Sequence, residues 1–374
     1  MRKYDIIVYG ASGFTASFVI EHLLQKDVSI ALAGRDEKKI RKNLKDISKA
    51  QDLEVFECEP KDAAIFTHLA RLIINLAGPY IFSGEEIIKA CLKTKTHYMD
   101  ITGETFFIEN VIKNYSKEAE KYGVALINCC GFDSVPADIG VEYLKNALQS
   151  NCKIESVMIL KKAILNYTTY ECLIHGLKNV STTRKLRSKG AKKENKIKKY
   201  FYNENTKSYN VIFMGTDPSV VKRTQNANKS NNKFTAEYFA YFDVGSWFNL
   251  QLFKFFFLIL LFLSKFNFGV KLLLNYPSFF TFGMIKKERP NKSDLEKASF
   301  EIKFFGENQN ERKNLTISGP DPGYKTTAIC ITNCAVSLLQ CHSFEGGVFT
   351  PAQFFYSKNL HEMLQKDGIV FKLE

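Results

Sequence analysis

Near the start of the chain, small residues follow a short apolar run at a spacing that suits dinucleotide binding. Gly10, Gly13 and Ala16 form the pattern G-x-x-G-x-x-A directly after residues 6–9. The first glycine permits a tight turn, the second lets the backbone approach a pyrophosphate, and the third small residue lets a helix pack on the strand. A bare structural turn is the alternative. The predicted phosphate-binding loop consists of Gly10, Ala11, Ser12, Gly13, Phe14 and Thr15.

A basic residue follows the second apolar run. Gly34 and Arg35 come directly after residues 29–33. In dinucleotide-binding domains an acidic residue here bonds the ribose 2′-hydroxyl, whereas an arginine accommodates a 2′-phosphate. A guanidinium group suits phosphate because it donates two parallel hydrogen bonds. We therefore expect NADP(H) rather than NAD(H), with Asp36 turned away as a helix cap; an ordinary surface arginine is the alternative.

Three further loops would lie at the same edge of a parallel sheet, where ligands bind. The residues expected beside the nicotinamide ribose are Asn75, Ala77, Gly78, Pro79 and Tyr80. The carboxylates that are candidates for proton delivery are Asp100, Glu104 and Asp133. Each carboxylate also suits a helix cap, and the Gly-Pro turn also suits a helix start, so these alternatives remain open.

The elements that position these loops alternate between strand and helix across residues 1–135. The predicted strands are 6–9, 29–33, 53–56, 72–76, 97–100 and 124–128. This alternation indicates an α/β fold with a doubly wound parallel sheet, that is, a Rossmann domain. We expect residues 343–374 to pack back onto it.

The pattern changes in residues 136–342, where predicted strands are longer and helices fewer. The predicted strands here are 153–160, 209–214, 234–242, 299–306 and 314–318, and a helix is predicted at 326–341. This pattern favours a second, α+β domain with an antiparallel sheet, which we assign to substrate binding.

An apolar stretch, residues 244–285, interrupts the second domain. This Phe-rich segment holds three charged residues, all lysines, and thirteen aromatic residues. A helix of twenty residues could span a bilayer, but Lys254 lies near the middle of residues 244–263. Aromatic side chains with flanking lysines favour a helix or hairpin lying in a membrane interface or lipid monolayer. A buried core and a true membrane span are the alternatives.

The charge distribution points to an anionic partner. The net charge is +13, and residues 184–199 contain nine Lys or Arg and one Glu. Such a basic segment would add attraction to anionic lipid, and a solvated loop is the alternative. It lacks the interleaved aromatics and recognised fold typical of nucleic-acid binding, so we expect no nucleic-acid partner.

The cysteines indicate the compartment. Nine cysteines include no C-x-x-C pair, and the first five residues lead straight into a strand without a signal peptide. We expect reduced thiols, no metal site and a cytosol-facing rather than secreted protein. The sequence does not predict the oligomeric state.

Motifs along nearly the whole chain resemble those of the saccharopine dehydrogenase-like oxidoreductases, a eukaryotic group similar to bacterial trans-acting enoyl reductases. The motifs occupy residues 8–15, 33–35, 75–80, 100–104, 131–138, 213–217, 221–225, 299–300, 319–324 and 346–351. The resemblance implies an NADP(H)-binding Rossmann domain, a second domain carrying the hydrophobic insertion, and association with membranes and lipid droplets. It also implies a role in lipid or glycolipid metabolism. Ala16 stands where the family usually has glycine.

These observations lead to two hypotheses about function. The first is an NADPH-dependent oxidoreductase that reduces an enoyl or carbonyl group of a lipid-like substrate at a membrane or lipid-droplet surface. Saccharopine itself is not the expected substrate. The second is a catalytically idle nucleotide-binding protein of membranes or lipid droplets.

Overall fold

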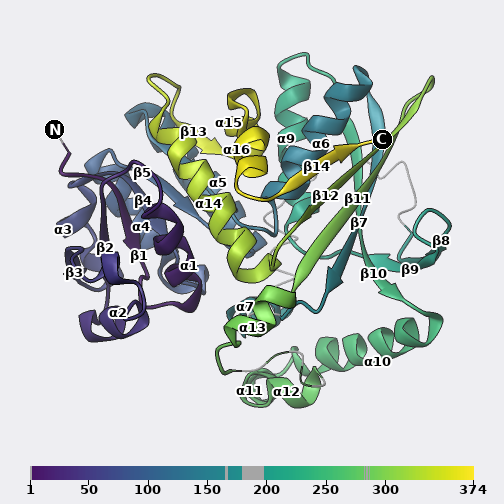
Figure 1. Cartoon of the computed structure of the whole chain (residues 1–374), viewed down its shortest axis with the longest axis horizontal. Coiled ribbons are helices and arrows are strands. Elements are labelled where there is room, and N and C mark those ends of the chain that lie inside the picture. Colours follow the sequence, from purple (N-terminus) through teal and green to yellow (C-terminus); the bar gives the residue numbers. More distant parts are fainter. Residues whose placement is uncertain (1, 165–166, 179–197, 282, 284, 286) are drawn as a thin grey trace. The chain divides into compact units, whose positions relative to one another are not determined.

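The computed structural model describes residues 2–164, 167–178, 198–281, 283, 285 and 287–374. The chain forms two compact units (Figure 1). The first comprises Met1–Val135 and Gly323–Asp367, and the second comprises Pro136–Pro322 and Gly368–Glu374. Of the basic segment 184–199, residues 184–197 lie outside the described residues; Lys198 and Lys199 are described and exposed.

The first unit is built on a parallel sheet. Its strands are β1 (Tyr4–Tyr9), β2 (Ile30–Gly34), β3 (Val55–Glu57), β4 (Ala70–Asn75), β5 (His97–Asp100), β6 (Ala125–Ile127) and β13 (Gly347–Phe349). They lie in the order β13-β6-β5-β4-β1-β2-β3, and every pairing is parallel. This order confirms the predicted Rossmann domain, because β1 lies between β2 and β4 where the winding direction reverses.

Helices cover this sheet and bury its apolar strands. They are α1 (Phe14–Leu23), α2 (Glu37–Asn43), α3 (Ala64–Thr67), α4 (Tyr80–Thr94), α5 (Thr105–Tyr122), α14 (Thr327–Leu339), α15 (Pro351–Phe355) and α16 (Leu360–Lys366). One core joins β1, β2 and β4 to α3, α4 and α5. α1 packs against α14. Parallel strands need such cover because both of their faces are apolar.

The second unit is built on a mixed sheet. Its strands are β7 (Cys152–Lys161), β8 (Tyr200–Asn203), β9 (Ser208–Ile212), β10 (Ala236–Gly245), β11 (Ser299–Glu307), β12 (Arg312–Gly319) and β14 (Val370–Leu373). They lie in the order β14-β12-β11-β7-β10-β9-β8. β7 and β10 run parallel, so the expectation of an antiparallel sheet is wrong for that pair. The long connection between them, which includes β8 and β9, leaves room for the crossover that a parallel pair requires.

The helices of the second unit are α6 (Val135–Leu148), α7 (Tyr167–Lys178), α9 (Asp217–Ser230), α10 (Trp247–Leu263), α11 (Asn267–Asn275), α12 (Pro277–Phe280) and α13 (Lys292–Lys297). α6 packs on the sheet so closely that a Cβ at Gly140 would lie 2.7 Å from the Phe304 ring.

The boundaries of the two units differ from those predicted in two places. The helix at 326–341, observed as α14, lies in the first unit rather than in the substrate domain, because it packs on α1. Of residues 343–374, which we expected to pack on the Rossmann domain, those up to Asp367 lie in the first unit, whereas the last seven lie in the second, where β14 pairs with β12. Edge pairing depends on a partner strand elsewhere in the chain, so local periodicity does not predict it.

The Phe-rich segment forms α10, α11 and α12. Many of its aromatic side chains are exposed, including Trp247, Phe255 and Phe268, so the buried-core alternative is wrong for this surface. A smaller apolar cluster holds the segment to α7 through Tyr170, Val270 and other residues. Among the described residues, no helix is both long enough and apolar enough to cross a membrane.

Candidate functional site

The loop after β1 has the geometry that close approach to a pyrophosphate requires. Gly10 has a φ of +83°, in the left-handed region that favours glycine. A Cβ at Gly10 would lie 2.7 Å from the Ala77 nitrogen and 2.9 Å from the Leu76 carbonyl carbon. The predicted loops after β1 and β4 therefore meet backbone to backbone at Gly10.

The N-terminus of α1 is open to an anion. The cap position is Gly13, which has no side chain to occupy the first N–H groups, and the first turn contains no acidic residue. Ala16 is fully buried, which explains the need for a small residue there. The N–H groups and the helix dipole at this end of α1 fit a phosphate group.

Arg35 is exposed just beyond β2 and forms no hydrogen bond or ion pair with the described residues. Its neighbour Asp36 accepts a hydrogen bond from the Lys39 N–H at 2.9 Å and caps α2, as predicted. That hydrogen bond lowers the pKa of Asp36. The acidic side chain is thus committed to the helix, and the guanidinium group next to it is available for a 2′-phosphate.

The loop after β4 is held by its own side chains. Asn75 Oδ1 accepts from the Ala77 N–H at 3.0 Å, and the Tyr80 hydroxyl donates to the Asn75 carbonyl at 3.1 Å. Gly78 and Pro79 lie between these anchors, joined by a cis peptide bond, and α4 begins at Tyr80. The five residues expected beside the nicotinamide ribose thus form one ordered turn next to Gly10.

Glu104 directly precedes α5, but its carboxylate binds the N-terminus of α4. Its carboxylate accepts hydrogen bonds from the N–H groups of Tyr80 at 2.6 Å and Ile81 at 3.0 Å, at the start of α4. An anion at a helix N-terminus is a stabilising cap. This contact favours the capping interpretation of Glu104 over proton delivery, and it leaves α1 as the better phosphate site.

Asp100 braces the ends of neighbouring strands. Its two carboxylate oxygens accept from Tyr98 Oη at 2.9 Å, the Thr102 N–H at 3.1 Å, Asn128 Nδ2 at 2.7 Å and the Cys129 N–H at 3.0 Å. Burial raises the pKa of Asp100 to about 6, although these hydrogen bonds act in the opposite direction. A fully buried carboxylate with four donors is placed to hold loops rather than to meet substrate.

Asp133 differs from the other two carboxylates. It is half-buried in the loop after β6, and its Oδ2 lies 3.5 Å from the position that a Cβ of Gly103 would occupy. The loops after β5 and β6 therefore converge at Asp133. Burial raises the pKa of this carboxyl group. Of the three candidates, Asp133 is the least buried.

Comparison with known proteins assigns this site to a family. A family model described as the saccharopine dehydrogenase NADP binding domain matches residues 6–127. The human protein named saccharopine dehydrogenase-like oxidoreductase is 32% identical over 418 aligned residues, which cover 100% of this chain and 97% of the relative. This chain belongs to the saccharopine dehydrogenase-like oxidoreductases. The predicted family and the predicted cofactor, NADP(H), are confirmed.

Two further similarities bear on location and fold. A Caenorhabditis elegans protein named lipid droplet localized protein is 31% identical over 422 aligned residues, covering 100% of this chain and 99% of the relative. The structure of an apo saccharopine dehydrogenase (L-Glu forming) from Saccharomyces cerevisiae matches with a TM-score of 0.56 and 15% identity, covering 99% of both chains. At that identity, the second match supports the fold alone.

Asn43, at the end of α2, is a site residue that sequence reasoning missed. In this saccharopine dehydrogenase-like oxidoreductase its Nδ2 donates to the carbonyl of Ala11 at 2.9 Å and to that of Gly13 at 2.8 Å. The Oδ1 of Asn43 is buried without a hydrogen-bond partner among the described residues. Such an orphan acceptor costs about 1–3 kcal/mol. Nothing local signals this role, because Asn43 lies 32 positions from Ala11 and 30 from Gly13.

Replacing Asn43 with alanine is expected to weaken NADPH binding by about tenfold, because the loop carbonyls lose both donors. Titration of NADPH fluorescence measures the effect. Gln51→Ala is the matched control, since Gln51 Nε2 donates to the Leu44 carbonyl at the same helix end but does not touch the loop. Equal NADPH affinity in the two variants would show that Asn43 serves stability only.

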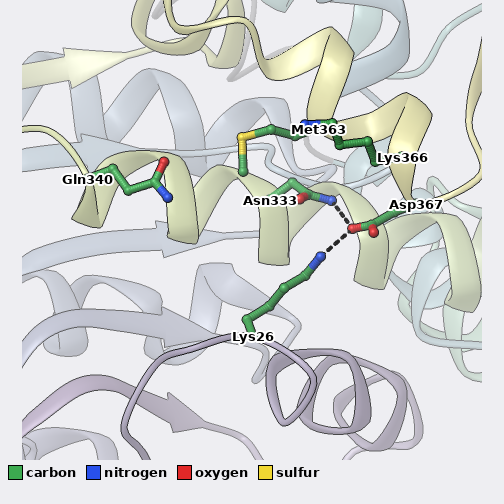
Figure 2. A pocket seen from close by; sticks show the side chains of 6 residues that line it. All are labelled: Lys26, Asn333, Gln340, Met363, Lys366 and Asp367. Atoms are coloured by element: carbon green, nitrogen blue, oxygen red, sulfur yellow. Dashed lines mark hydrogen bonds and ion pairs between the residues drawn. The ribbon is translucent and has the colours of Figure 1, made fainter.

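A separate pocket lies near the other end of α1. Lys26 Nζ and Asn333 Nδ2 each donate to Asp367 Oδ2 at 2.7 Å, in a pocket of about 360 Å³. Figure 2 shows Asp367 between these two side chains. Burial opposes ionisation of Asp367, but donors from Lys26, Asn333 and His22 outweigh it and lower its pKa. The ten residues of α1 put this pocket about 15 Å from the phosphate-binding end. We therefore interpret these hydrogen bonds as structural contacts that hold α1, α14 and α16 together.

The described residues contain no group of three or more His, Cys, Asp or Glu placed to hold a metal ion. All nine cysteines are free thiols. Cys130 and Cys334 lie deep in the first unit, and burial raises the pKa of both, which makes them unreactive.

Proposed function

We propose that this oxidoreductase uses NADPH to reduce an enoyl or carbonyl group of a lipid-like substrate at the surface of a lipid droplet or cytosol-facing membrane. The observation that carries the proposal is the exposed aromatic surface of α10–α12, in a chain whose first unit has the NADP(H) loop. The name of the Caenorhabditis elegans relative supports this location. A role in lipid or glycolipid metabolism follows from such a substrate.

The basic segment 184–199 belongs to the same proposal. Its nine basic residues would add electrostatic attraction wherever the lipid surface is anionic. The contribution is about 1 kcal/mol for each basic residue near the surface and is weakened by salt.

The residues at the ends of β5 and β6 suggest how the reduction receives its proton. Bound NADPH supplies the hydride. Each hydride added to a C=C or C=O group requires one proton at the other atom of that double bond. Asp133 is our candidate donor, because its raised pKa keeps the carboxyl group protonated closer to neutral pH. Asp100 and Glu104 are positioned instead to hold the loops around it.

The test of the activity is NADPH oxidation, followed by absorbance, against enoyl, ketone and imine lipids presented in vesicles. We expect turnover with the enoyl or ketone lipids and none with saccharopine. If the purified protein binds NADPH but does not oxidise it with any acceptor of the panel, the result would instead support the catalytically idle alternative.

Replacing Asp133 with asparagine is expected to lower kcat by about 10²–10⁴-fold, the usual contribution of a general acid. NADPH affinity should stay unchanged, since Asp133 lies outside the nucleotide loop. In the unsubstituted enzyme kcat should fall as pH rises through the raised pKa of Asp133, because only the protonated carboxyl donates. In the Asp133→Asn variant, kcat should not fall over this pH range.

Glu104→Gln is the control for the Asp133 variant. Loss of the charged cap on α4 should lower the melting temperature but leave the pH dependence of kcat intact. An unchanged pH profile in Asp133→Asn would remove Asp133 from the reaction.

A further inference from the structure

α10 has an apolar surface on every side but packs against protein on one side only. Its sequence from Trp247 to Leu263 includes one charged residue, Lys254. Leu250 alone is buried, while Leu260 and Leu263 pack partly against the cluster with α7 and α11. A helix that is apolar all round is normally buried, so the uncovered side requires a partner.

The five most exposed large hydrophobic side chains of α10 share one face of the helix. At 100° per residue, they fall within an arc of about 100°. These residues are Trp247, Phe248, Phe255, Leu258 and Phe262, and they are 59–68% exposed. We call them the aromatic face. Lys254 lies over the Tyr200 ring of β8, with its Nζ 3.6 Å from the ring centroid, so the charge sits at the border of this face.

The same surface continues onto the next two helices and is firmly supported. Phe268 on α11 and Phe279 on α12 are 64% and 77% exposed. The hydroxyl groups of Tyr167 and Tyr170 on α7 donate to the carbonyls of Leu274 and Leu273 at the end of α11. Figure 1 shows α10 leading from the end of β10 to α11 and α12. The surface is therefore part of the folded unit.

The chemistry of this surface selects its partner. Residues 244–285 contain no Asp or Glu, and Lys265 and Lys271 are exposed beside the aromatic side chains. Lysines at the border of this surface can pair with lipid phosphate groups. Bulky aromatic rings among few charges need open space between headgroups in order to insert. A protein partner would require polar groups at the rim of the surface that pair with it. A loosely packed phospholipid surface, such as a droplet monolayer, satisfies all of these features.

We propose that α10 lies flat on a phospholipid surface and inserts its aromatic face into packing gaps between headgroups, so that loosely packed lipid is preferred over tightly packed lipid of equal charge. The inference rests on the proposed action at a lipid surface. It adds the residues that insert and the property of the surface that they recognise.

The single tryptophan of the chain makes this insertion measurable without a label. Trp247 lies on the aromatic face, so its emission reports on that face alone. The probes are phosphatidylcholine vesicles with dioleoyl chains and vesicles of saturated phosphatidylcholine with cholesterol. We expect a blue shift, quenching by brominated phosphatidylcholine, and about tenfold tighter binding to the dioleoyl vesicles.

Matched substitutions test the orientation of the helix. Phe255→Ser and Leu258→Ser should each weaken vesicle binding about tenfold, because each removes one inserted side chain. Phe253→Ser is the control, since Phe253 is 38% exposed on another side of α10. NADPH affinity, measured on each variant, verifies that it has folded.

Three outcomes would overturn the inference. They are equal effects of Phe253→Ser and Phe255→Ser, equal binding to the two vesicle types, and binding that follows added phosphatidylserine while Trp247 remains in water. The last result would leave action at a lipid surface intact and assign adhesion to charge. NADPH oxidation with an acceptor in detergent tests the proposed reduction independently of all three.

Discussion

Replacing Arg35 with glutamate is expected to weaken NADPH binding at least about a hundredfold and to change NADH binding less than about threefold. The guanidinium group is exposed and unpaired among the described residues, so its charge is available to the 2′-phosphate. The substitution removes a charge-assisted bidentate contact and adds repulsion, and a loss of about 2.7 kcal/mol corresponds to a hundredfold. Calorimetric titration with both dinucleotides measures the ratio.

Lys38→Glu provides the control for Arg35, because Lys38 is an exposed lysine on α2 and its substitution causes the same change of net charge. Its effect on the NADPH to NADH ratio should be small. If Arg35→Glu weakens the two dinucleotides equally, Arg35 does not read the 2′-phosphate, and the selectivity of the site lies elsewhere.

Replacing Gly10 with alanine is expected to abolish measurable NADPH binding and to lower the free energy of unfolding by roughly 3 kcal/mol. The new methyl group would meet backbone atoms of Leu76 and Ala77 at 2.9 and 2.7 Å, and a φ of +83° is unfavourable for alanine. The loops after β1 and β4 would have to move apart, which displaces the pyrophosphate site. Chemical denaturation and NADPH titration measure the two effects.

Gly123→Ala separates backbone strain from the clash. Gly123 has a φ of +66° at the end of α5, but a Cβ there would have no heavy atom within 4 Å. We expect a cost of about 1–2 kcal/mol and normal NADPH binding. Retention of NADPH binding by Gly10→Ala would contradict the role given to this turn.

The Rossmann domain was predictable because its signals are local. The apolar run of β1, the glycines that follow it and the cap formed by Asp36 act over a few residues, and each appears in the structure. The prediction of an antiparallel second sheet was wrong for the pair β7 and β10, and the assignment of residues 326–341 to the substrate domain was wrong, since both depend on which distant segments pack together. The spacing of residues in the sequence predicts which helices and strands form better than it predicts which of them lie side by side.

The same distinction between local sequence signals and tertiary contacts applies to the carboxylates of the candidate site. Asp100, Glu104 and Asp133 have equivalent places in the sequence, each just beyond a predicted strand. Their surroundings separate them, because Asp100 is enclosed by four donors and Glu104 by the first N–H groups of α4. Asp133 is half-buried where the loops after β5 and β6 converge, and it is our candidate for proton transfer.

The Phe-rich segment shows most clearly the difference between what composition indicates and what packing decides. Composition alone identified an unusually apolar, aromatic stretch with few charges and left open whether it is buried or faces lipid. Packing of α10 against neighbours on one side leaves Phe255 and Leu258 on the other. Likewise, the motif around Gly10 together with Arg35 indicated the cofactor, but only the folded chain brings Asn43 to that loop. Composition and short motifs record local conformational preference, whereas burial and hydrogen-bond partners depend on contacts between residues far apart in the chain.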